Sequence, residues 1–246
     1  MSGKRSLELI VSLPAPPTYT VADVARYVYV PMATLRSWIQ GRTYLASGVT
    51  RRSVPIIVPP SPRGPEPGLS FVNLIEAYVL GAIRRKYGIS LHKVRRAILN
   101  LTHLGEREHP LARKQFKTNW IALFVEHYGG TIEISRDLQL QMKEVLSTYL
   151  QRIDYVADGS PLRLYPFSTP HQEEHEAATA SRLIAISPLN AFGKPTIAGT
   201  GIGTFVIADR YLAGDSPDAI AKDYGRSREE IDAAIRWEFS CSRPAA

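Results

Sequence analysis

Three glycines near the C-terminus raise the question of a phosphate-binding loop. The segment Gly199-Thr200-Gly201-Ile202-Gly203 has the composition of a glycine-rich nucleotide loop, but it does not match G-x-G-x-x-G. No long strand–helix–strand unit with a downstream acid surrounds it. Gly193-Lys194 is followed by Pro195 and has no glycine five residues earlier, so it is not a Walker loop. The sequence therefore predicts no nucleotide cofactor.

Two histidines form the other arrangement that could do chemistry. His171 and His175 are four residues apart, a spacing that could bind a metal ion on one face of a helix. They lie in a polar, acidic segment with no cysteine nearby, and the single Cys241 excludes a disulfide framework and a multi-cysteine zinc site. No Ser/His/Asp or Cys/His set has local support. We therefore expect no metal, no cofactor and no enzymatic activity.

Polar and basic side chains near the N-terminus suit a third kind of chemistry, the binding of nucleic acid. Short polar groups and long hydrogen-bond donors fit a major groove lined with acceptors and phosphates. The candidate DNA-binding residues of this kind are Thr34, Arg36, Ser37 and Gln40.

The charge distribution points to the same half of the chain. Residues 1–128 contain 18 Lys/Arg and 7 Asp/Glu, whereas residues 129–181 contain 4 and 8 and residues 182–246 contain 8 of each. The basic surplus of the protein therefore lies wholly in the first half, which predicts a polyanionic partner for that half alone. A solvated basic face that binds nothing is the alternative.

Two short predicted helices position the N-terminal polar residues. Thr20 can cap a helix from Val21 to about Val28, and a second helix is expected from Pro31 to Gln40 and ends at Gly41. Tyr29 stands in the turn where many helix-turn-helix units have a left-handed glycine, so the turn must differ or carry strain. The expected shared core is Val24, Ala25, Val28, Leu35, Trp38 and Ile39.

The middle of the chain predicts helices alternating with short strands. A strand is expected at Val54–Val58 after a turn-rich stretch, and the proline-rich residues 59–68 form a stiff connection. Helices are expected at 71–86, from Ser90 onward and at 137–150. Strands are expected at 120–125, 131–134, 153–156 and 162–165. The basic cluster from Arg84 to Arg96 either extends a phosphate footprint or complements helix dipoles.

The last third predicts a compact helical unit. Short strands are expected at 183–186 and 196–197, followed by helices that end at Gly214, at Gly225 and near Phe239. Ser227 and Glu230 have the spacing of a capping box at the start of the last helix. The expected core is Ile197, Ile202, Val206, Leu212, Ile220 and Ile231.

At its N-terminus the chain resembles the MerR-like family. Tyr19-Thr20-Val21 through Val24-Ala25, followed by Thr34-Leu35-Arg36, matches the opening of that family, and the resemblance covers about residues 18–104. It implies a winged helix in which a β-wing at Thr43–Val58 brings three arginines near phosphates. These are Arg42, Arg51 and Arg52.

At its C-terminus the chain resembles a small antitoxin domain found in prokaryotic gene pairs. The resemblance covers about residues 184–238 and lies in four segments, Gly193–Ile202, Tyr211–Pro217, Ile220–Tyr224 and Ile231–Ile235. It implies a PIN-like toxin as partner, as in VapBC systems, although Gly201 replaces the arginine usual in the family. The candidate toxin-binding residues are Gly199, Thr200 and Ile202, with Arg236 or Arg243 as an inserted cation.

Together these observations predict a mainly α-helical protein with small β elements. A MerR-like winged helix-turn-helix at 18–104 is followed by an α/β bridging or dimerisation region at 105–165, a linker at 166–181 and a small helical, helix-turn-helix-like antitoxin domain at 182–239. Such a chain would repress its own operon by binding double-stranded operator DNA and would neutralise a PIN-like ribonuclease toxin. We expect a homodimer or a hetero-oligomer with the toxin. A MerR-like, ligand-sensing regulator without a toxin partner is the alternative.

The sequence also bears on location. No apolar run approaches the roughly 20 residues that a membrane span requires. The stretch Leu7–Leu13 is short and interrupted by Glu8, so it is a poor signal peptide. We therefore expect a cytoplasmic protein with no membrane partner.

Overall fold

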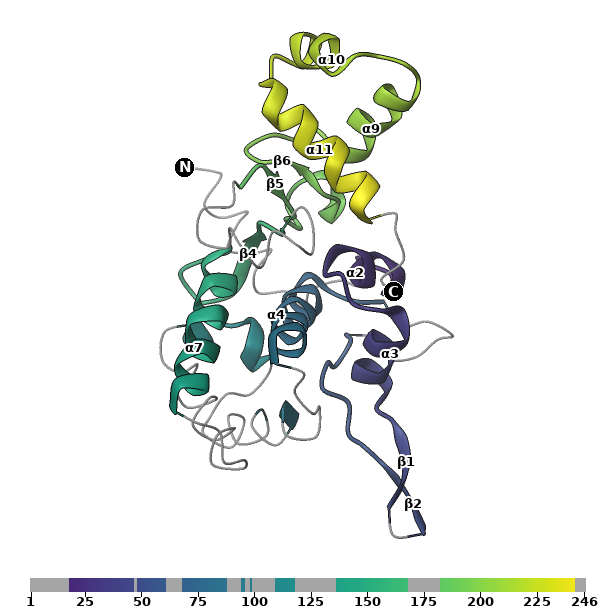
Figure 1. Cartoon of the computed structure of the whole chain (residues 1–246), viewed down its shortest axis with the longest axis vertical. Helices are drawn as coiled ribbons and strands as arrows, with labels where there is room; N and C mark the ends of the chain where they lie inside the picture. The colour runs from purple at the N-terminus through teal and green to yellow at the C-terminus, as the bar shows by residue number, and fades with distance from the viewer. Residues whose placement is uncertain are drawn as a thin grey trace. The chain divides into compact units, whose positions relative to one another are not determined.

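The computed structural model describes residues 18–46, 48–60, 68–87, 94–95, 98, 109–117, 136–167 and 182–241. The chain divides into two compact units, one of Met1–Leu150 with Tyr155–Pro161 and one of Gln151–Asp154 with Leu162–Ala246. Helices dominate both units, and the strands form small two-stranded sheets (Figure 1). The predicted fold class, mainly α with small β elements, is confirmed. Within the described residues, no helix is both long and apolar enough to cross a membrane.

The first unit begins with the expected helical pair. Helix α2 (Val21–Tyr27) starts after Thr20, whose hydroxyl oxygen accepts from the Asp23 N–H while the Asp23 carboxylate accepts from the Thr20 N–H. Helix α3 (Met32–Gln40) follows after a short turn. The expected shared core is buried. Both predicted helices are confirmed, with Pro31 one residue before the first helical position.

A β-hairpin follows α3, but it does not use the predicted strand. Strands β1 (Thr43–Ala46) and β2 (Val49–Arg52) pair antiparallel in the stretch expected to be turn-rich. The strand predicted at Val54–Val58 is wrong. Pro55 has no N–H for a ladder, and the N–H groups of Ile56 and Ile57 donate to the Trp38 carbonyl at 2.8 and 3.1 Å.

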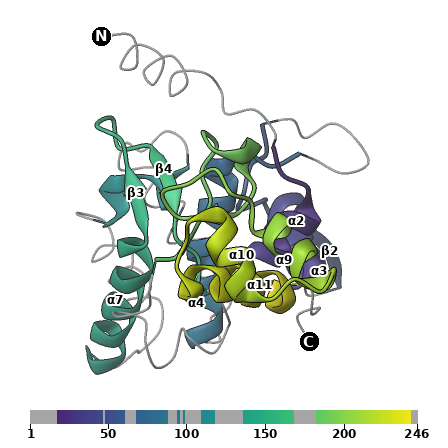
Figure 2. The ribbon, with the colours of Figure 1, turned by 90° about the horizontal axis from the view of Figure 1, so that it is seen from above.

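Helix α4 (Phe71–Tyr87) is the central element of the first unit. Figures 1 and 2 both show it between the α2–α3 pair and α7 (Arg136–Gln151). Its side chains from Leu74 to Ile83 are buried, and the rings of Tyr78 and Tyr149 lie 5.2 Å apart between centroids. A short 3-10 helix, η1 (Pro110–Ala112), also packs against α4. The helices predicted at 71–86 and 137–150 are confirmed.

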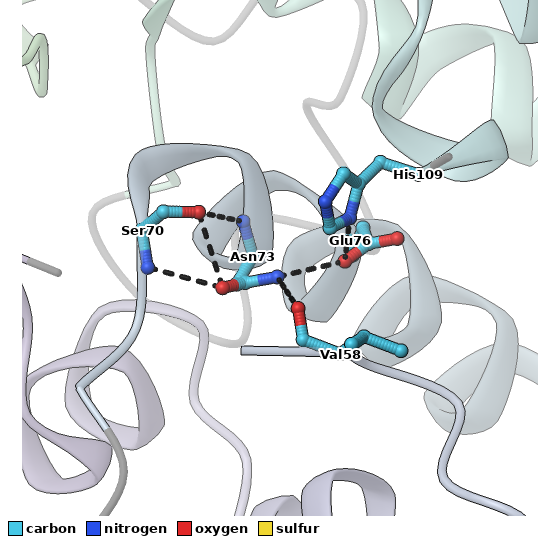
Figure 3. Close-up of polar contacts among 5 residues, drawn as sticks. All are labelled: Val58, Ser70, Asn73, Glu76 and His109. Atoms are coloured by element: carbon cyan, nitrogen blue, oxygen red, sulfur yellow. Dashed lines mark hydrogen bonds and ion pairs between the residues drawn. The ribbon is translucent and has the colours of Figure 1, made fainter. Parts of the chain in front are cut away.

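A buried polar cluster lies at the start of α4 (Figure 3). The Asn73 Oδ1 atom accepts from the N–H and hydroxyl of Ser70, and its Nδ2 donates to the Val58 carbonyl at 3.0 Å and to the Glu76 carboxylate at 3.1 Å. His109 Nδ1 lies 3.1 Å from the same Glu76 oxygen. Asn73 and Glu76 are buried, so these bonds take the place of water. The cluster ties α4 to the segment after the hairpin and to the start of η1.

Several predicted elements lie wholly or mostly outside the described residues. These are the helix from Ser90, the strands at 120–125 and 131–134, and nearly all of the linker at 166–181. Of the first, Arg95 is helical and half-buried, while Val94 and Ile98 are helical and buried. The strands β3 (Ile153–Tyr155) and β4 (Pro161–Leu164) pair as a two-stranded sheet and confirm the two predicted strands there.

The second unit combines short strands with a cluster of helices. Strands β5 (Ile184–Ala185) and β6 (Thr196–Ile197) pair antiparallel, with the 3-10 helix η3 (Ala191–Gly193) between them. Figure 2 shows α9 (Thr204–Leu212), α10 (Pro217–Tyr224) and α11 (Arg228–Cys241) gathered together. The predicted capping box is present, because the Glu230 carboxylate accepts from the Ser227 N–H and the Ser227 hydroxyl from the Glu230 N–H. The predicted strands and helices are confirmed.

The core of the second unit contains half of the residues predicted for it. Ile197, Ile220 and Ile231 are fully buried, and Trp237 of α11 lies among the most buried side chains. Ile202 and Val206 are half-buried, whereas Leu212 is 68% exposed. Leu212 is the last residue of α9 and points away from the helix cluster, so its prediction as core was wrong.

The buried cluster around Asn73 should contribute to the stability of the first unit. Asn73→Ala removes the side-chain partner of the Ser70 N–H and of the Val58 carbonyl. It also removes the amide donor to the buried Glu76 carboxylate, which keeps its contact with His109. We expect the free energy of unfolding of the first unit to fall by about 2–4 kcal/mol, measured by urea denaturation. Asp23→Ala removes a capping residue of the same kind at a half-buried position and should cost about 1 kcal/mol. Equal losses in the two variants would contradict a structural role for the buried cluster.

Candidate nucleic-acid interface

Helix α3 presents its polar residues on the face opposite its core. Leu35, Trp38 and Ile39 are buried. Arg36 and Gln40 are exposed, whereas Thr34 and Ser37 are half-buried at the edge of the exposed face. The arrangement matches the helix that enters the major groove in helix-turn-helix proteins.

Thr34 is held by a residue that sequence analysis did not assign to the site. The Arg84 guanidinium of α4 donates to the Thr34 hydroxyl oxygen at 2.9 Å. The Ser37 hydroxyl donates to the Thr34 carbonyl at 2.7 Å, so it is used within the helix. Arg84 is exposed and therefore adds a cation beside α3. Its sequence signal was the basic cluster after Val79, but the contact spans fifty residues and has no local pattern.

The turn between α2 and α3 carries the strain that Tyr29 suggested. Tyr29 has φ +51°, in the left-handed region where glycine is usual. The Val30 N–H donates to the Ala25 carbonyl at 3.0 Å, as in a Schellman motif. Arg85 of α4 donates to the carbonyls of Val28 and Tyr29 at 2.7 and 3.3 Å. These bonds hold the turn in its strained form.

The base of the β1–β2 hairpin is fixed to the end of α3. The Arg42 N–H donates to the Ser53 hydroxyl at 2.8 Å, and the Ser53 N–H donates to the Arg42 carbonyl at 2.8 Å. The Arg52 guanidinium donates to the Gln40 carbonyl at 3.1 Å, so it caps the C-terminus of α3. One predicted DNA contact, Arg52, therefore also has a structural role.

The hairpin itself stands in solvent. Figure 1 shows it projecting beyond α3, and both of its strands are exposed where side chains are described. Arg51 pairs across the hairpin with Tyr44, and Arg42 lies at its base. Arg95 donates to the Val54 carbonyl at 2.7 Å, and partial burial lowers the pKa of its guanidinium. Arg36 on α3 and Arg51 on the hairpin therefore lie on two elements that follow each other in the chain.

The buried Tyr19 lies just before the start of α2. Burial raises the pKa of Tyr19, and the nearby Tyr27 and Asp23 raise it further, so the phenol stays neutral. The backbone N–H groups of Thr18 and Tyr19 both donate to the Leu69 carbonyl, at 2.9 and 3.0 Å. This bridge fixes α2 to the residues just before α4.

The predicted toxin-binding residues of the second unit lie in a tight turn between β6 and α9. Gly199 has φ +76°, and the Thr200 hydroxyl donates to the Ile197 carbonyl and accepts from the Ile202 N–H. Gly199 is exposed, while Thr200 and Ile202 are half-buried. Arg236 is exposed on α11, and Arg243 lies outside the described residues.

Three arginines in the segment from α9 to α11, Arg210, Arg226 and Arg228, form ion pairs within the second unit. Arg210 lies 2.6 Å from Asp215 and 2.8 Å from Asp223, and hydrogen bonds to these two acids raise the pKa of its guanidinium. The other pairs are Arg228 with Asp218 and Asp232, and Arg226 with Glu230. The bonds to Asp218 and Asp232 raise the pKa of Arg228 as well. Burial works against ionisation of Glu230, but hydrogen bonds from Arg226 and Ser227 outweigh it and lower the pKa of that carboxyl.

The residues that could have bound a metal are not brought together in the described parts of the chain. Within those parts, no three His, Cys, Asp or Glu side chains gather closely enough to hold an ion. His171 and His175 lie outside them.

Comparisons with known proteins match both ends of the chain to domain families. Residues 17–98 match a family described as "Putative DNA-binding HTH domain". Residues 184–237 match one described as "Protein of unknown function (DUF433)". The first match covers α2, α3, the hairpin and α4, and the second runs from β5 into α11.

Two proteins of Mycobacterium tuberculosis are similar over most of the chain. One is named "Putative antitoxin VapB45" and is 29% identical, over 96% of this chain and 98% of its own length. The other, named "Uncharacterized protein Rv2308", is 24% identical over 89% of each chain. The crystal structure of Rv2018 from the same organism has a TM-score of 0.67 and 26% identity, covering 89% of this chain and 98% of that one. The similarity therefore extends through both units.

The junction between α3 and the hairpin should tolerate only glycine at position 41. Gly41 has φ +75°, and an added Cβ would lie 2.1 Å from the Ser53 carbonyl oxygen. Gly48, in the hairpin turn, has φ +76° and no atom within 4 Å of an added Cβ. Gly48→Ala should cost about 1 kcal/mol from backbone strain alone, whereas Gly41→Ala adds a clash with backbone and should cost about 3 kcal/mol or more.

Thermal unfolding followed by circular dichroism measures both variants. Both glycines have a positive φ, but Gly41 also has ψ −179°, a region that only glycine adopts readily. The larger loss expected in Gly41→Ala therefore combines backbone strain with the clash at the base of the hairpin. If Gly41→Ala unfolds at the same temperature as Gly48→Ala, the hairpin is not fixed to α3 through Ser53.

Proposed function

We propose that this protein is a DNA-binding antitoxin that represses its own operon and neutralises a PIN-like ribonuclease. The observation that carries the proposal is the similarity along nearly the whole chain to a protein named as an antitoxin. A helix-turn-helix match in the basic half agrees with it. The two activities belong to different units of the chain.

The DNA-binding part is a MerR-like winged helix-turn-helix that uses α3 and the hairpin. Arg36, Ser37 and Gln40, with Thr34 at the edge, reach base edges in the major groove. Arg42, Arg51 and Arg52 contact phosphates, which position the protein but carry no sequence information. Arg84 adds a further phosphate contact, since its remaining N–H groups are available beyond the bond to Thr34. One recognition helix buries too little surface for specific affinity, so the protein binds operator DNA as a dimer.

The toxin-binding part is the second unit. A PIN-like ribonuclease has a cluster of carboxylates around Mg²⁺, so an inhibitor can cover the cleft or insert a cation among the acids. The paired arginines Arg210, Arg226 and Arg228 supply little free positive charge, which argues against a second DNA-binding surface and in favour of a protein partner. The residues proposed for the contact are Gly199, Thr200, Ile202, Arg236 and Arg243.

The DNA-binding proposal is tested by two arginine variants. Arg36→Ala should lose roughly 1–3 kcal/mol on the preferred operator and relax its sequence preference, because the arginine contacts bases. Arg51→Ala should weaken binding to all sequences alike and lower the slope of log K against log[salt] by about one, because it contacts a phosphate. Gel shifts over a salt series with specific and scrambled fragments measure both effects.

Arg236→Ala is the matched control, because it removes an exposed arginine from the second unit. It should leave operator binding unchanged. A wild-type dimer that binds no fragment of its own promoter at low salt would overturn the DNA-binding proposal. An equal loss in all three variants would mean that the net charge, and not α3, governs binding.

The toxin proposal is tested by growth rescue with the full chain. Shortened chains are a poor choice, because the N–H and carbonyl groups of Leu164 both pair with Ile186. Wild type should restore growth of cells that express the adjacent PIN-like nuclease. The double variant Arg36→Ala/Arg51→Ala should rescue equally well, whereas Thr200→Arg/Arg236→Glu should fail because it alters shape and charge on the second unit.

The expression level of each chain is held equal from an unrelated promoter, so that loss of repression does not alter the result. Failure of the wild-type chain to rescue growth would overturn the antitoxin function. Failure of the double variant in the first unit would show that toxin binding depends on the DNA-binding residues.

A further inference from the structure

The loop before β6 holds three consecutive residues in the left-handed region. Ala191, Phe192 and Gly193 have φ of +46°, +55° and +81°. This conformation is ordinary for glycine but costs free energy in alanine and phenylalanine. Two backbone hydrogen bonds stabilise this conformation. The Gly193 N–H donates to the Asn190 carbonyl at 2.9 Å, and the Lys194 N–H donates to the Ala191 carbonyl at 3.0 Å.

Among the described residues of the second unit, none makes a contact that explains why a phenylalanine stands at position 192 of this loop. The Phe192 side chain is 90% exposed, so the strained backbone does not serve to bury its ring. Strain of this kind occurs where the surrounding structure fixes a functional group in place. A phenylalanine held out in solvent by a rigid loop is a ready anchor for a partner protein, because its pose needs no further ordering on binding.

The neighbouring side chains extend this anchor into a patch. Leu189 in the same loop and Phe205 at the start of α9 are each about two-fifths exposed, at 40% and 42%. The Lys194 ammonium lies 5.0 Å from the centroid of the Phe205 ring. A Cβ at Gly203 would lie 2.5 Å from the Phe205 ring, so the glycine lets this ring lie against the backbone. We name the four side chains Leu189, Phe192, Lys194 and Phe205 the Phe192 patch.

The charge of the patch indicates what covers it. Arg210, Arg226 and Arg228 are paired with acids of their own unit. Lys194, by contrast, forms no ion pair among the described residues, and its charge is met by an aromatic ring alone. A complementary surface therefore has an apolar pocket for Phe192 and a carboxylate beside it for Lys194.

We propose that the Phe192 patch is the surface on which the toxin docks, with Phe192 in an apolar pocket of the nuclease and Lys194 against a carboxylate at the rim of that pocket. This proposal rests on the proposed function. It places the principal anchor outside the residues expected from the sequence, although the Gly199–Ile202 turn leads directly into Gly203 and Phe205. An exposed aromatic anchor with a neighbouring cation is typical of the residues that dominate protein–protein affinity.

The experiment measures binding of purified full-length chain to the PIN-fold protein encoded beside it, by calorimetry or surface plasmon resonance. Phe192→Asn removes the ring but keeps a residue that tolerates the left-handed region. It should raise Kd by about thirtyfold or more, as loss of a hot spot does, with an unchanged or raised melting temperature. Lys194→Glu should raise Kd about tenfold and reduce its salt dependence.

Two matched controls lie elsewhere on the same unit. Leu212→Asn removes an exposed apolar side chain from the other end of α9, and Lys222→Glu reverses an exposed charge on α10. Both should leave Kd within about twofold of wild type, as expected for residues outside an interface. A loss in these variants equal to that in Phe192→Asn would overturn the assignment of the patch.

Two other outcomes separate the alternatives. Wild-type chain that does not bind the nuclease overturns the proposed function and this docking surface with it, whereas undiminished binding by Phe192→Asn overturns the docking surface alone. Sedimentation of the free chain tests a second copy as the occupant. A wild-type dimer that becomes monomeric in Phe192→Asn would show that the patch joins two copies of this chain and would overturn the proposal.

Discussion

The first unit depends on a carboxylate and an amide buried at the start of α4. Buried polar groups must be hydrogen-bonded, and Asn73 and Glu76 meet this requirement only if the segment after the hairpin and the start of η1 lie where they do. The other end of the same helix carries Arg84 and Arg85, which donate to α3 and to the turn before it. One buried helix therefore positions both α3 and the chain that returns from the hairpin.

Several arginines of the first unit form hydrogen bonds within the protein and still have donors that a ligand could use. Arg52, Arg84 and Arg85 bond to carbonyl or hydroxyl oxygens of the protein itself. A guanidinium has five N–H donors, so one such bond leaves others for a phosphate. Side chains that are already ordered lose less conformational entropy when a ligand binds. In the proposed DNA-binding function, the intramolecular bonds of Arg52 and Arg84 would order these cations for DNA while they stabilise the fold. The strained turn at Tyr29 is tolerated because Arg85 bonds its carbonyl.

Local signals in the sequence predicted the helices, and long-range contacts explain the failures. Capping pairs such as Thr20 with Asp23 and Ser227 with Glu230 mark helix starts within a few residues, so those elements could be predicted. The β-branched run at Val54–Val58 has strand propensity, but the Trp38 carbonyl takes its N–H groups, and that contact depends on how α3 is placed. Arg84 and Thr34 meet only after α4 has packed. No sequence pattern predicts a phenylalanine in the left-handed region, so the conformation of Phe192 is known only from the backbone of the structure.

The separation of charge between the two units gives each surface its selectivity. A basic surface attracts any polyanion and any acidic protein through long-range forces, which salt screens over about 10 Å. A nuclease with a carboxylate-lined site would be drawn to the basic first unit as readily as DNA is. A toxin contact that is specific must therefore rely on shape and burial more than on charge. The second unit meets this condition because Arg210, Arg226 and Arg228 are paired within it, while Phe192 is held out on a strained loop. Apolar contact at a rigid anchor is short-ranged and unaffected by competing polyanions, so under the proposed function the same chain would hold DNA and a toxin without either displacing the other through charge.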